Sequence, residues 1–202
     1  MFFFFENIHF MSLFVSEDEF SQQTFSKEQI LDLKRKTFSN CTFEHCNFSN
    51  SNLAYATFID CTFHHCNLSL ANVERVRFQG VIFDHCKLLG VHFSKCEEHF
   101  LSIQCKASLI DTCNFSNLDL KGTKFLHCTM RDNQFNETKL TSADFSNSDL
   151  RGSTFHHSDL CKANFTEAIN YSINPLTNKL SKARFSKPEV LNLLLYLDIV
   201  IE

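Results

Sequence analysis

An apolar residue recurs at every fifth position along most of this chain. The series runs from Phe38 to Phe93 and resumes two residues late, from Phe100 to Phe165, and 22 of its 26 members are Phe or Leu. We refer to each such residue as the centre of a five-residue unit. A period of five matches neither the 3.6 of a helix nor the 2 of a flat strand. It favours short extended segments joined at corners, so that four units close a square coil.

The positions around each centre predict which side chains point inward. A small residue lies two before most centres, as at Cys41, Ala56 and Ser148, and Asn or Asp often lies between the two. Alternation along an extended segment turns the centre and the small residue inward and leaves the other three positions in water. All four glycines fall two after a centre, where a corner favours conformational freedom. The predicted core residues include Phe43, Phe48, Phe63, Phe83, Phe125 and Phe145.

The ends of the repeat tract are expected to carry caps, because a stack of coils exposes open edges. Residues 1–35 form the predicted N-terminal segment and cap, in which Ser26 and Gln29 have the spacing of a capping box that starts a short helix. The repeat domain spans residues 36–167, with a small interruption at 97–98. Residues 168–202 form the predicted C-terminal cap, with a second helix start at Ser186 and Glu189.

The C-terminal helix expected within KPEVLNLLLYLD is apolar on more than one face. A cap needs only one apolar face, so the second indicates a partner surface. We predict a homodimer joined through the C-terminal ends, with a snug intramolecular cap as the alternative and a final short strand in LYLDIVIE. The predicted dimer-interface residues are Leu191, Leu194, Leu195, Leu197, Ile199 and Ile201.

The repeating pattern of a small residue, Asn or Asp, Leu or Phe and two further residues resembles that of the pentapeptide-repeat family. The resemblance covers residues 36–167. It implies an all-β fold, a right-handed quadrilateral β-helix of about six to seven coils, followed here by a C-terminal capping and dimerisation helix.

Within this family the chain is most similar to a bacterial subgroup that protects type II topoisomerases, which includes the Qnr-type quinolone-resistance proteins and the microcin immunity protein. The similarity rests on a repeat tract of similar length, followed by INPLTNKL, SKPEVLNLLLYL and DIVIE. It implies a rod-shaped dimer that binds DNA gyrase or topoisomerase IV and protects it from a quinolone or microcin, for some relatives by DNA mimicry. The candidate topoisomerase-facing residues are Glu97, Glu98, Asp119, Asp144, Asp149 and Asp159.

Two features separate this chain from the Qnr type. Qnr-type proteins carry projecting loops, whereas only Glu97 and Glu98 interrupt the repeats here, so the loopless immunity-protein type fits better. Residues 36–167 also carry 14 acidic and 12 basic side chains, a weaker charge than a mimic of the phosphate backbone requires. An ordinary solvated face is therefore an equal alternative for the acidic residues.

Composition and charge exclude several classes of protein. A net charge of −4 without a basic patch argues against direct nucleic-acid binding. The apolar N-terminal stretch carries Glu6, lacks the basic region and cleavage site of a signal peptide, and is too short to cross a membrane. The ten cysteines are then expected to be reduced and the protein cytoplasmic. Met11 is an alternative start, so membership of residues 1–10 in the mature protein stays open, as does export as an effector.

Cysteine and histidine recur together with a 20-residue spacing, at Cys46, Cys66 and Cys86 and at His45, His65 and His85. The cysteines occupy the small inward position and the histidines the outward position before it, so a mixed Cys/His metal site is disfavoured. Cysteine is expected here as a small apolar filler. The histidines form a surface column, one coil apart, which favours at most weak binding of a divalent ion.

The remaining chemistry argues against an enzyme. In HHSDL, Ser158 points inward and His157 outward, so no nucleophile–base pair forms. No phosphate-binding motif is present, and a filled solenoid offers no pocket. We predict a non-enzymatic protein with no cofactor and no resident metal. The alternatives to topoisomerase protection are an interaction scaffold for an unrelated protein, including one of a host, and a weak metal binder through the histidine column.

Overall fold

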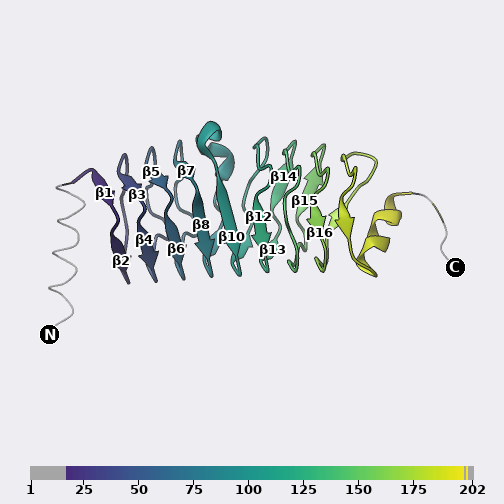
Figure 1. Cartoon of the computed structure of the whole chain (residues 1–202), viewed down its shortest axis with the longest axis horizontal. Helices are drawn as coiled ribbons and strands as arrows, with labels where there is room; N and C mark the ends of the chain where they lie inside the picture. Colours follow the sequence, from purple (N-terminus) through teal and green to yellow (C-terminus); the bar gives the residue numbers. More distant parts are fainter. Residues whose placement is uncertain (1–16, 198, 200–202) are drawn as a thin grey trace.

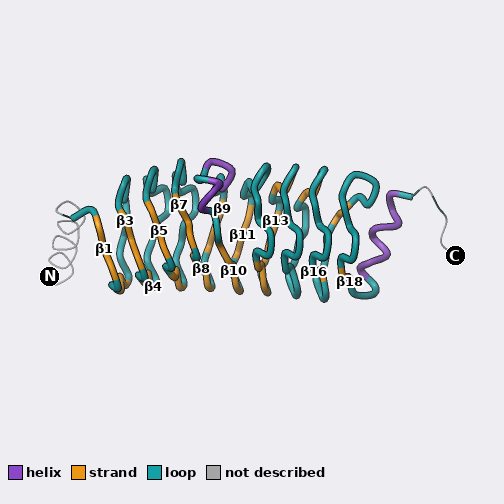
Figure 2. Tube along the Cα trace, turned by 45° about the horizontal axis from the view of Figure 1, so that its top comes forward, coloured by secondary structure: helices purple, strands orange, loops and turns teal. Residues whose placement is uncertain are grey.

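The computed structural model describes residues 17–197 and Ile199, which wind into a rod of stacked coils (Figure 1). Each coil turns through short extended segments, and equivalent segments of successive coils pair in parallel along the rod (Figure 2). The fold is therefore a quadrilateral β-solenoid, of about eight coils. We number its four sides face 1 to face 4, in the order in which each coil meets them.

Faces 1 and 2 carry most of the paired strands. Face 1 holds a parallel sheet of β1 (Glu19–Ser21), β3 (Thr37–Ser39), β5 (Thr57–Ile59) and β7 (Arg77–Gln79). Face 2 holds a parallel sheet of β2 (Thr24–Ser26), β4 (Thr42–Glu44), β6 (Thr62–His64), β8 (Val81–Asp84), β10 (Ile103–Lys106) and β12 (Lys124–Leu126). Farther along face 2, β16 (Asn164–Phe165) pairs with β18 (Arg184–Phe185).

Faces 3 and 4 have shorter sheets. Face 3 contains β9 (Lys87–Leu89), β11 (Leu109–Asp111) and β13 (Thr129–Arg131). Face 4 contains β14 (Gln134–Asn136), β15 (Thr154–His156) and β17 (Ser172–Ile173). Isolated parallel bridges such as Asn47 with Asn67 continue the same pairing between the other coils.

The strand register gives the length of each coil. Paired residues lie 20 positions apart along most of the rod, as between Thr37 and Thr57. The spacing is 18 between the first two coils, as at Glu19–Thr37 and Thr24–Thr42, and again at Thr154–Ser172. It is 22 across one coil, as at Val81–Ile103 and Lys87–Leu109. The period read from the sequence is therefore the circumference of the solenoid, with three local departures.

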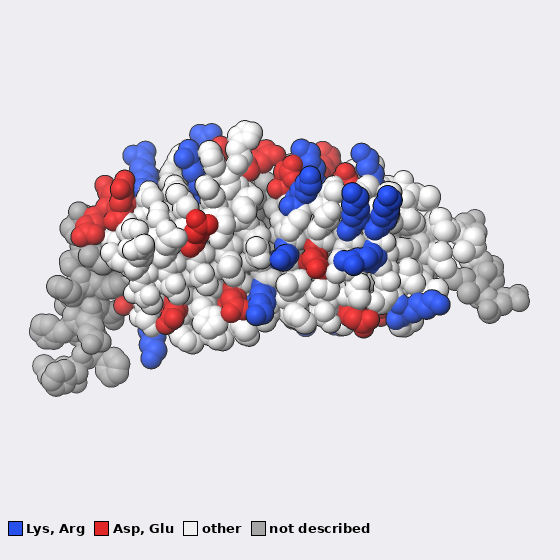
Figure 3. Space-filling model, in the orientation of Figure 1, with Lys and Arg blue, Asp and Glu red and all other residues white. Residues whose placement is uncertain are grey.

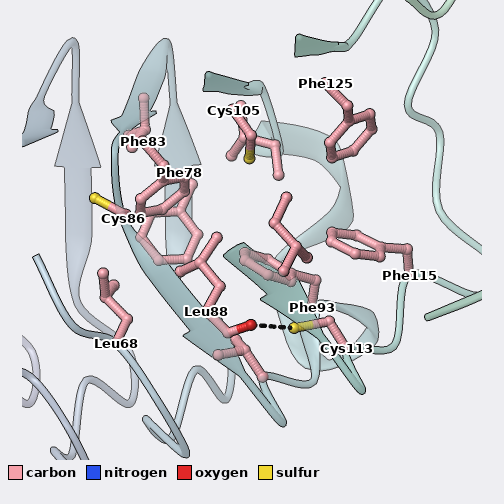
Figure 4. Close-up of a cluster of buried hydrophobic side chains, with 14 of the residues drawn as sticks. Leu68, Phe78, Phe83, Cys86, Leu88, Phe93, Cys105, Cys113, Phe115 and Phe125 are labelled. Atoms are coloured by element: carbon pink, nitrogen blue, oxygen red, sulfur yellow. Dashed lines mark hydrogen bonds between the residues drawn. The ribbon is translucent and has the colours of Figure 1, made fainter. Parts of the chain in front are cut away.

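The predicted phenylalanine core is confirmed, since all six named residues are fully buried. Along a face, rings of successive coils stack, as for Phe43 and Phe63, whose centroids are 4.7 Å apart at 15°. Around a coil, rings meet edge to face, as for Phe43 and Phe48 at 5.4 Å and 76°. Both geometries are favourable for aromatic pairs. The core is therefore a continuous column of interlocked rings and aliphatic side chains (Figure 4).

The corners fall where the glycines predicted them. The four glycines have φ between 63° and 72°. At Gly152, a Cβ atom would collide with the carboxylate of Asp132 on the preceding coil, so any side chain here would have to displace that of Asp132. Many other corners adopt the same left-handed conformation with ordinary residues, for example His65 at 52°.

Small inward residues bond each coil to the preceding one. The thiol of Cys113 donates a hydrogen bond to the carbonyl of Leu88 at 3.2 Å (Figure 4). Burial raises the pKa of this thiol to about 12, which keeps the proton on sulfur. Nearer the C-terminus, the hydroxyl of Ser148 donates to the carbonyl of Phe125 at 2.8 Å and accepts from the amide of Cys128 at 2.9 Å. The inward cysteines are thus hydrogen-bond donors as well as the small fillers that were predicted.

The predicted N-terminal helix is not present among the described residues. The segment that contains Ser26 and Gln29 is instead part of a further coil, in which β1 and β2 pair with β3 and β4. The buried centres of this coil are Phe20, Phe25, Ile30 and Leu33. Leu33 follows Ile30 by three positions instead of five. The five-residue period is therefore interrupted, and the sequence pattern does not reveal this coil.

Coiling also continues beyond residue 167 and ends at the predicted C-terminal helix. Ile173 is fully buried, and Phe185 packs on the core before the 3₁₀ helix η3 (Glu189–Tyr196) begins. Ser186 does not cap this helix, because its hydroxyl accepts a hydrogen bond from the amide of Glu167 at 3.1 Å. Of the predicted final strand LYLDIVIE, Leu195 and Tyr196 belong to η3, and residues 198 and 200–202 lie outside the described residues. Among the described helices, none is long and apolar enough to span a membrane.

The interruption at 97–98 is larger than predicted. Two 3₁₀ helices, η1 (Phe93–Lys95) and η2 (Glu98–Phe100), lift the chain off the rod at the teal protrusion in Figure 1. Phe100, expected as a centre, is 42% exposed, and Leu101 is buried in its place. The two extra residues of this coil are taken up here, in residues 93–101, which we refer to as the bulge.

Candidate functional site

Four of the six acidic residues predicted to face a partner hold the backbone of their own coil. Oδ1 of Asp144 accepts a hydrogen bond from the amide of residue 146 at 2.9 Å, and Oδ1 of Asp159 accepts one from Cys161 at 3.0 Å. Asp119 and Asp149 make the same contact two residues on. The backbone hydrogen bond from Cys161 lowers the pKa of the Asp159 carboxyl. Such turns explain why Asn and Asp recur before the centres.

These four aspartates also lie on three different faces. Asp119 and Asp159 are on face 1 with Lys139 between them along the rod, and Nζ of Lys139 lies 3.6 Å from Asp119. Asp144 is on face 2 and Asp149 on face 3. Acidic and basic side chains are interspersed on the face shown in Figure 3. The structure therefore does not join the four aspartates into one acidic surface.

Glu97 and Glu98 lie together on the bulge. The Glu97 carboxylate is 3.8 Å from Nε of Arg75, and Glu98 is exposed at the start of η2. The guanidinium of Arg77 lies 4.7 Å from the centroid of the Phe100 ring, in cation–π contact. Aromatic residues and arginine are both enriched at protein interfaces. The exposed Phe100 is a site feature that the periodic pattern concealed.

The predicted dimer interface forms one end of the rod. Leu193 of η3 packs against the core, and the Tyr196 hydroxyl is hydrogen-bonded to that of Ser172, so the helix is fastened to the last coil. Leu195 is 80% exposed and Leu191 is 52% exposed. Ile199 is exposed, Leu194 and Leu197 are half-buried, and Ile201 lies outside the described residues. One face of η3 therefore caps the core while other leucines meet solvent.

Histidines stack at successive corners of face 2. The rings of His45 and His65 are 4.9 Å apart at 6°, and those of His65 and His85 are 4.9 Å apart. Partial desolvation, followed by the neighbouring histidines, lowers the pKa of His65. The cysteines beside this column are buried and turned inward, as predicted.

Two further residues, His64 and Asp84, lie beside the column of His45, His65 and His85. The 20-residue spacing of the histidines did not predict them. His64 and Asp84 face each other in the register of β6 and β8, and the His64 ring lies 4.2 Å from that of His65. The pair His64–His65 precedes the pair Asp84–His85 by one 20-residue period. Comparing whole units at that spacing, rather than the corner position alone, would have found both residues.

Ser158 and His157 do not form a nucleophile–base pair. Ser158 is buried, and its hydroxyl donates to the carbonyl of Phe135. His157 is exposed and its ring lies 4.1 Å from that of His156. This unit serves as wall in the same way as its neighbours.

Comparison with known proteins agrees with this geometry. A family model described as a pentapeptide repeat region matches residues 36–104 and 98–165. A trypsin-treated variant of QnrB1, a plasmid-mediated fluoroquinolone resistance protein, superimposes with a TM-score of 0.76 at 14% identity, covering 91% of this chain and 98% of that one. A second treated variant gives 0.62 at 17% identity, covering 91% and 100%.

A third similar structure is HetL of the cyanobacterium Nostoc, which is involved in the regulation of heterocyst differentiation. It has a TM-score of 0.47 at 15% identity and covers 87% of this chain and 90% of that one. No curated protein matches the sequence. At these identities the similarity shows a shared fold.

Proposed function

Because this chain belongs to the pentapeptide-repeat family, we propose that it is a non-enzymatic binding protein that engages DNA gyrase or topoisomerase IV and protects the enzyme from a quinolone or microcin. The observation that carries the proposal is the superposition of the rod on nearly the whole chain of a trypsin-treated variant of a fluoroquinolone resistance protein, with a TM-score of 0.76. The packed core supports a role through the outer surface. All ten cysteines are free thiols, which fits a reducing, cytoplasmic location.

The bulge is the part of the rod that we assign to topoisomerase contact. It raises Glu97, Glu98 and Phe100 above the wall, whereas Asp119, Asp144, Asp149 and Asp159 are spread over three faces and serve their own turns. Charge mimicry of DNA is not part of this proposal, because lysines are interspersed with the aspartates. The contact is instead centred on an exposed ring flanked by charges.

The first test is a DNA cleavage assay with purified DNA gyrase and a quinolone. The protein should reduce quinolone-stabilised cleavage at micromolar concentration. The double variant Glu98→Lys, Phe100→Ala should need about 30-fold more protein, since loss of an interface hot spot of about 2 kcal/mol weakens binding by that factor. Leu70→Ala, at an exposed corner outside the bulge, should protect like the wild type.

Two outcomes would count against the proposal. If the protein changes neither supercoiling nor quinolone-stabilised cleavage, topoisomerase protection is rejected and an interaction scaffold for another protein takes its place. If the bulge variant protects as well as the wild type, the contact surface is not the bulge.

We also propose that two copies join through their C-terminal ends. The helix η3 already caps the core of its own chain through Leu193. Its exposed Leu191 and Leu195, with Ile199 beyond the helix, form an apolar surface at the end of the rod. Burying such side chains against a second copy removes apolar area from water, which stabilises association by about 25 cal/mol per Å².

Leu195→Asp should convert the dimer to a folded monomer, because an aspartate at the apolar end would be desolvated in the interface. Light scattering should show a molar mass falling from about twice 23.4 kDa to that of one chain. Leu31→Asp, another exposed leucine far from this end, should leave the mass unchanged. A wild type with the mass of a single chain, or a variant that remains dimeric, would rule out this interface.

A further inference from the structure

Three imidazoles gather on the outer surface of face 2. Each of His64, His65 and His85 can offer one ring nitrogen, and these nitrogens lie within 4.8 Å of one another. His64 and His65 come from one coil and His85 from the next. The rings of His64 and His85 are 5.9 Å apart, and both lie closer to His65, at 4.2 and 4.9 Å.

The backbone holds these side chains at the same height on adjacent coils. His64 is paired with Asp84 in the parallel register of β6 and β8. His65 and His85 both occupy left-handed corners with φ of 52°, and the amide of His65 donates to the carbonyl of Asp84 at 3.0 Å. The cluster therefore rests on rigid wall rather than on a loop.

Asp84 orients two of the three imidazoles. Its Oδ2 lies 3.0 Å from Nδ1 of His64, and its Oδ1 lies 2.9 Å from Nδ1 of His85. A carboxylate only accepts hydrogen bonds, so it favours the neutral tautomer with the proton on Nδ1 and the lone pair on Nε2. Carboxylates play this part behind metal-binding histidines, where they fix the tautomer and raise ligand basicity.

We propose that His64, His65 and His85 bind one divalent transition-metal ion, with Zn²⁺ as the expected species and Asp84 as the residue that orients two of the ligands. Imidazole nitrogens suit Zn²⁺, Cu²⁺ and Ni²⁺. Zinc–nitrogen bonds of about 2.0–2.1 Å place tetrahedral ligands about 3.4 Å apart, which the partly exposed side chains reach by small rotations. Three protein ligands leave a fourth position open to water or to a group from a bound molecule.

His45 is a neighbour of this site and not one of its ligands. Its ring stacks flat on that of His65 at 4.9 Å, which supports the orientation of His65. The metal site therefore differs from the column of His45, His65 and His85, because its third nitrogen comes from His64. It is independent of topoisomerase binding.

The test is a titration of the full-length, metal-free protein with Zn²⁺ by calorimetry, followed by Co²⁺ for its visible spectrum. We expect one ion per chain and no thiolate-to-cobalt charge-transfer band. His65→Ala should weaken binding by more than about tenfold, and Asp84→Asn by about 10- to 100-fold. Zinc should raise the Tm of the wild type and not that of His65→Ala, because the site joins two coils.

His157→Ala is the matched control, since His156 and His157 form an adjacent pair without a third histidine nearby among the described residues. It should bind zinc like the wild type. Equal affinities for the wild type and His65→Ala would overturn the proposal. A site abolished by Cys161→Ser, the one cysteine that is not fully buried, would do so too.

Discussion

Phe63→Ala should lower the free energy of unfolding by about 3–5 kcal/mol. Phe63 is fully buried in the middle of the rod, and its ring stacks on Phe43 at 4.7 Å and lies 5.1 Å from Phe83. Removing the ring leaves a cavity. The neighbouring coils cannot collapse into it, because backbone pairing between the strands holds the coils at a fixed spacing. Equilibrium denaturation in urea, followed by circular dichroism, measures the loss.

Ile82→Ala is the control for this prediction. Ile82 lies on the next strand of the same face but points outward and is 39% exposed, so its truncation should cost less than about 1 kcal/mol. Comparable losses for the two variants would mean that the phenylalanine column does not dominate the stability of the solenoid.

Asn133→Ala should destabilise the protein by about 2–4 kcal/mol, although only a small polar group is removed. Asn133 is fully buried; its Oδ1 accepts from the amide of Cys113 at 2.9 Å, and its Nδ2 donates to the carbonyl of Ile110 at 3.0 Å. Alanine leaves the amide of Cys113 buried without its acceptor, at about 1–3 kcal/mol, and removes the second hydrogen bond, at about 0.5–1.5 kcal/mol. The same denaturation experiment measures the effect.

Asn133→Ser separates hydrogen bonding from volume. Ser153, at the equivalent position of the next coil, donates to the carbonyl of Met130 at 3.1 Å and accepts from the amide of Asn133 at 3.2 Å. A serine at 133 should therefore replace both bonds. Its free energy of unfolding should recover more than half of the loss measured for the alanine variant. If serine and alanine are equally destabilising, the hydrogen bonds are not the cause.

The core and the corners follow from the sequence because both are set by short-range repetition. Large apolar residues such as Phe63 recur at five-residue intervals, and a coil of four such units turns each of them inward. Gly152 similarly marks a corner, since its left-handed conformation is one that glycine adopts most easily. The burial of Phe63 and the corner at Gly152 can both be predicted without knowing which distant segments of the chain are in contact.

The departures from the pattern arise where coil length changes. Leu33 follows Ile30 by three positions, so a coil of 18 residues looked like a cap. At the bulge, Phe100 keeps the five-residue spacing yet is exposed, because Leu101 is buried in its place on a coil of 22 residues. A large apolar residue at the expected five-residue spacing is therefore not always buried, because the number of residues per coil can change.

The site residues were harder to predict because their roles depend on side-chain contacts, either within one coil or between neighbouring coils. Asp144 reads as a surface charge until its hydrogen bond to the amide of residue 146 is seen. His64 is unremarkable in its own unit and becomes significant only beside Asp84 and His85, one coil later. Contacts between coils, unlike the apolar beat, depend on side-chain geometry that spacing does not specify.

The 22-residue coil has a consequence for how this rod can vary. Strands resume the 20-residue register immediately after it, since Cys105 pairs with Phe83 before it and with Phe125 beyond it. The extra length is therefore absorbed without rotating the later faces about the long axis, whereas a lasting shift of five residues would turn every later side chain by a quarter revolution. The orientation of the later faces about the long axis therefore does not depend on the bulge. The bulge can change in length or sequence while η3 at the far end keeps its orientation.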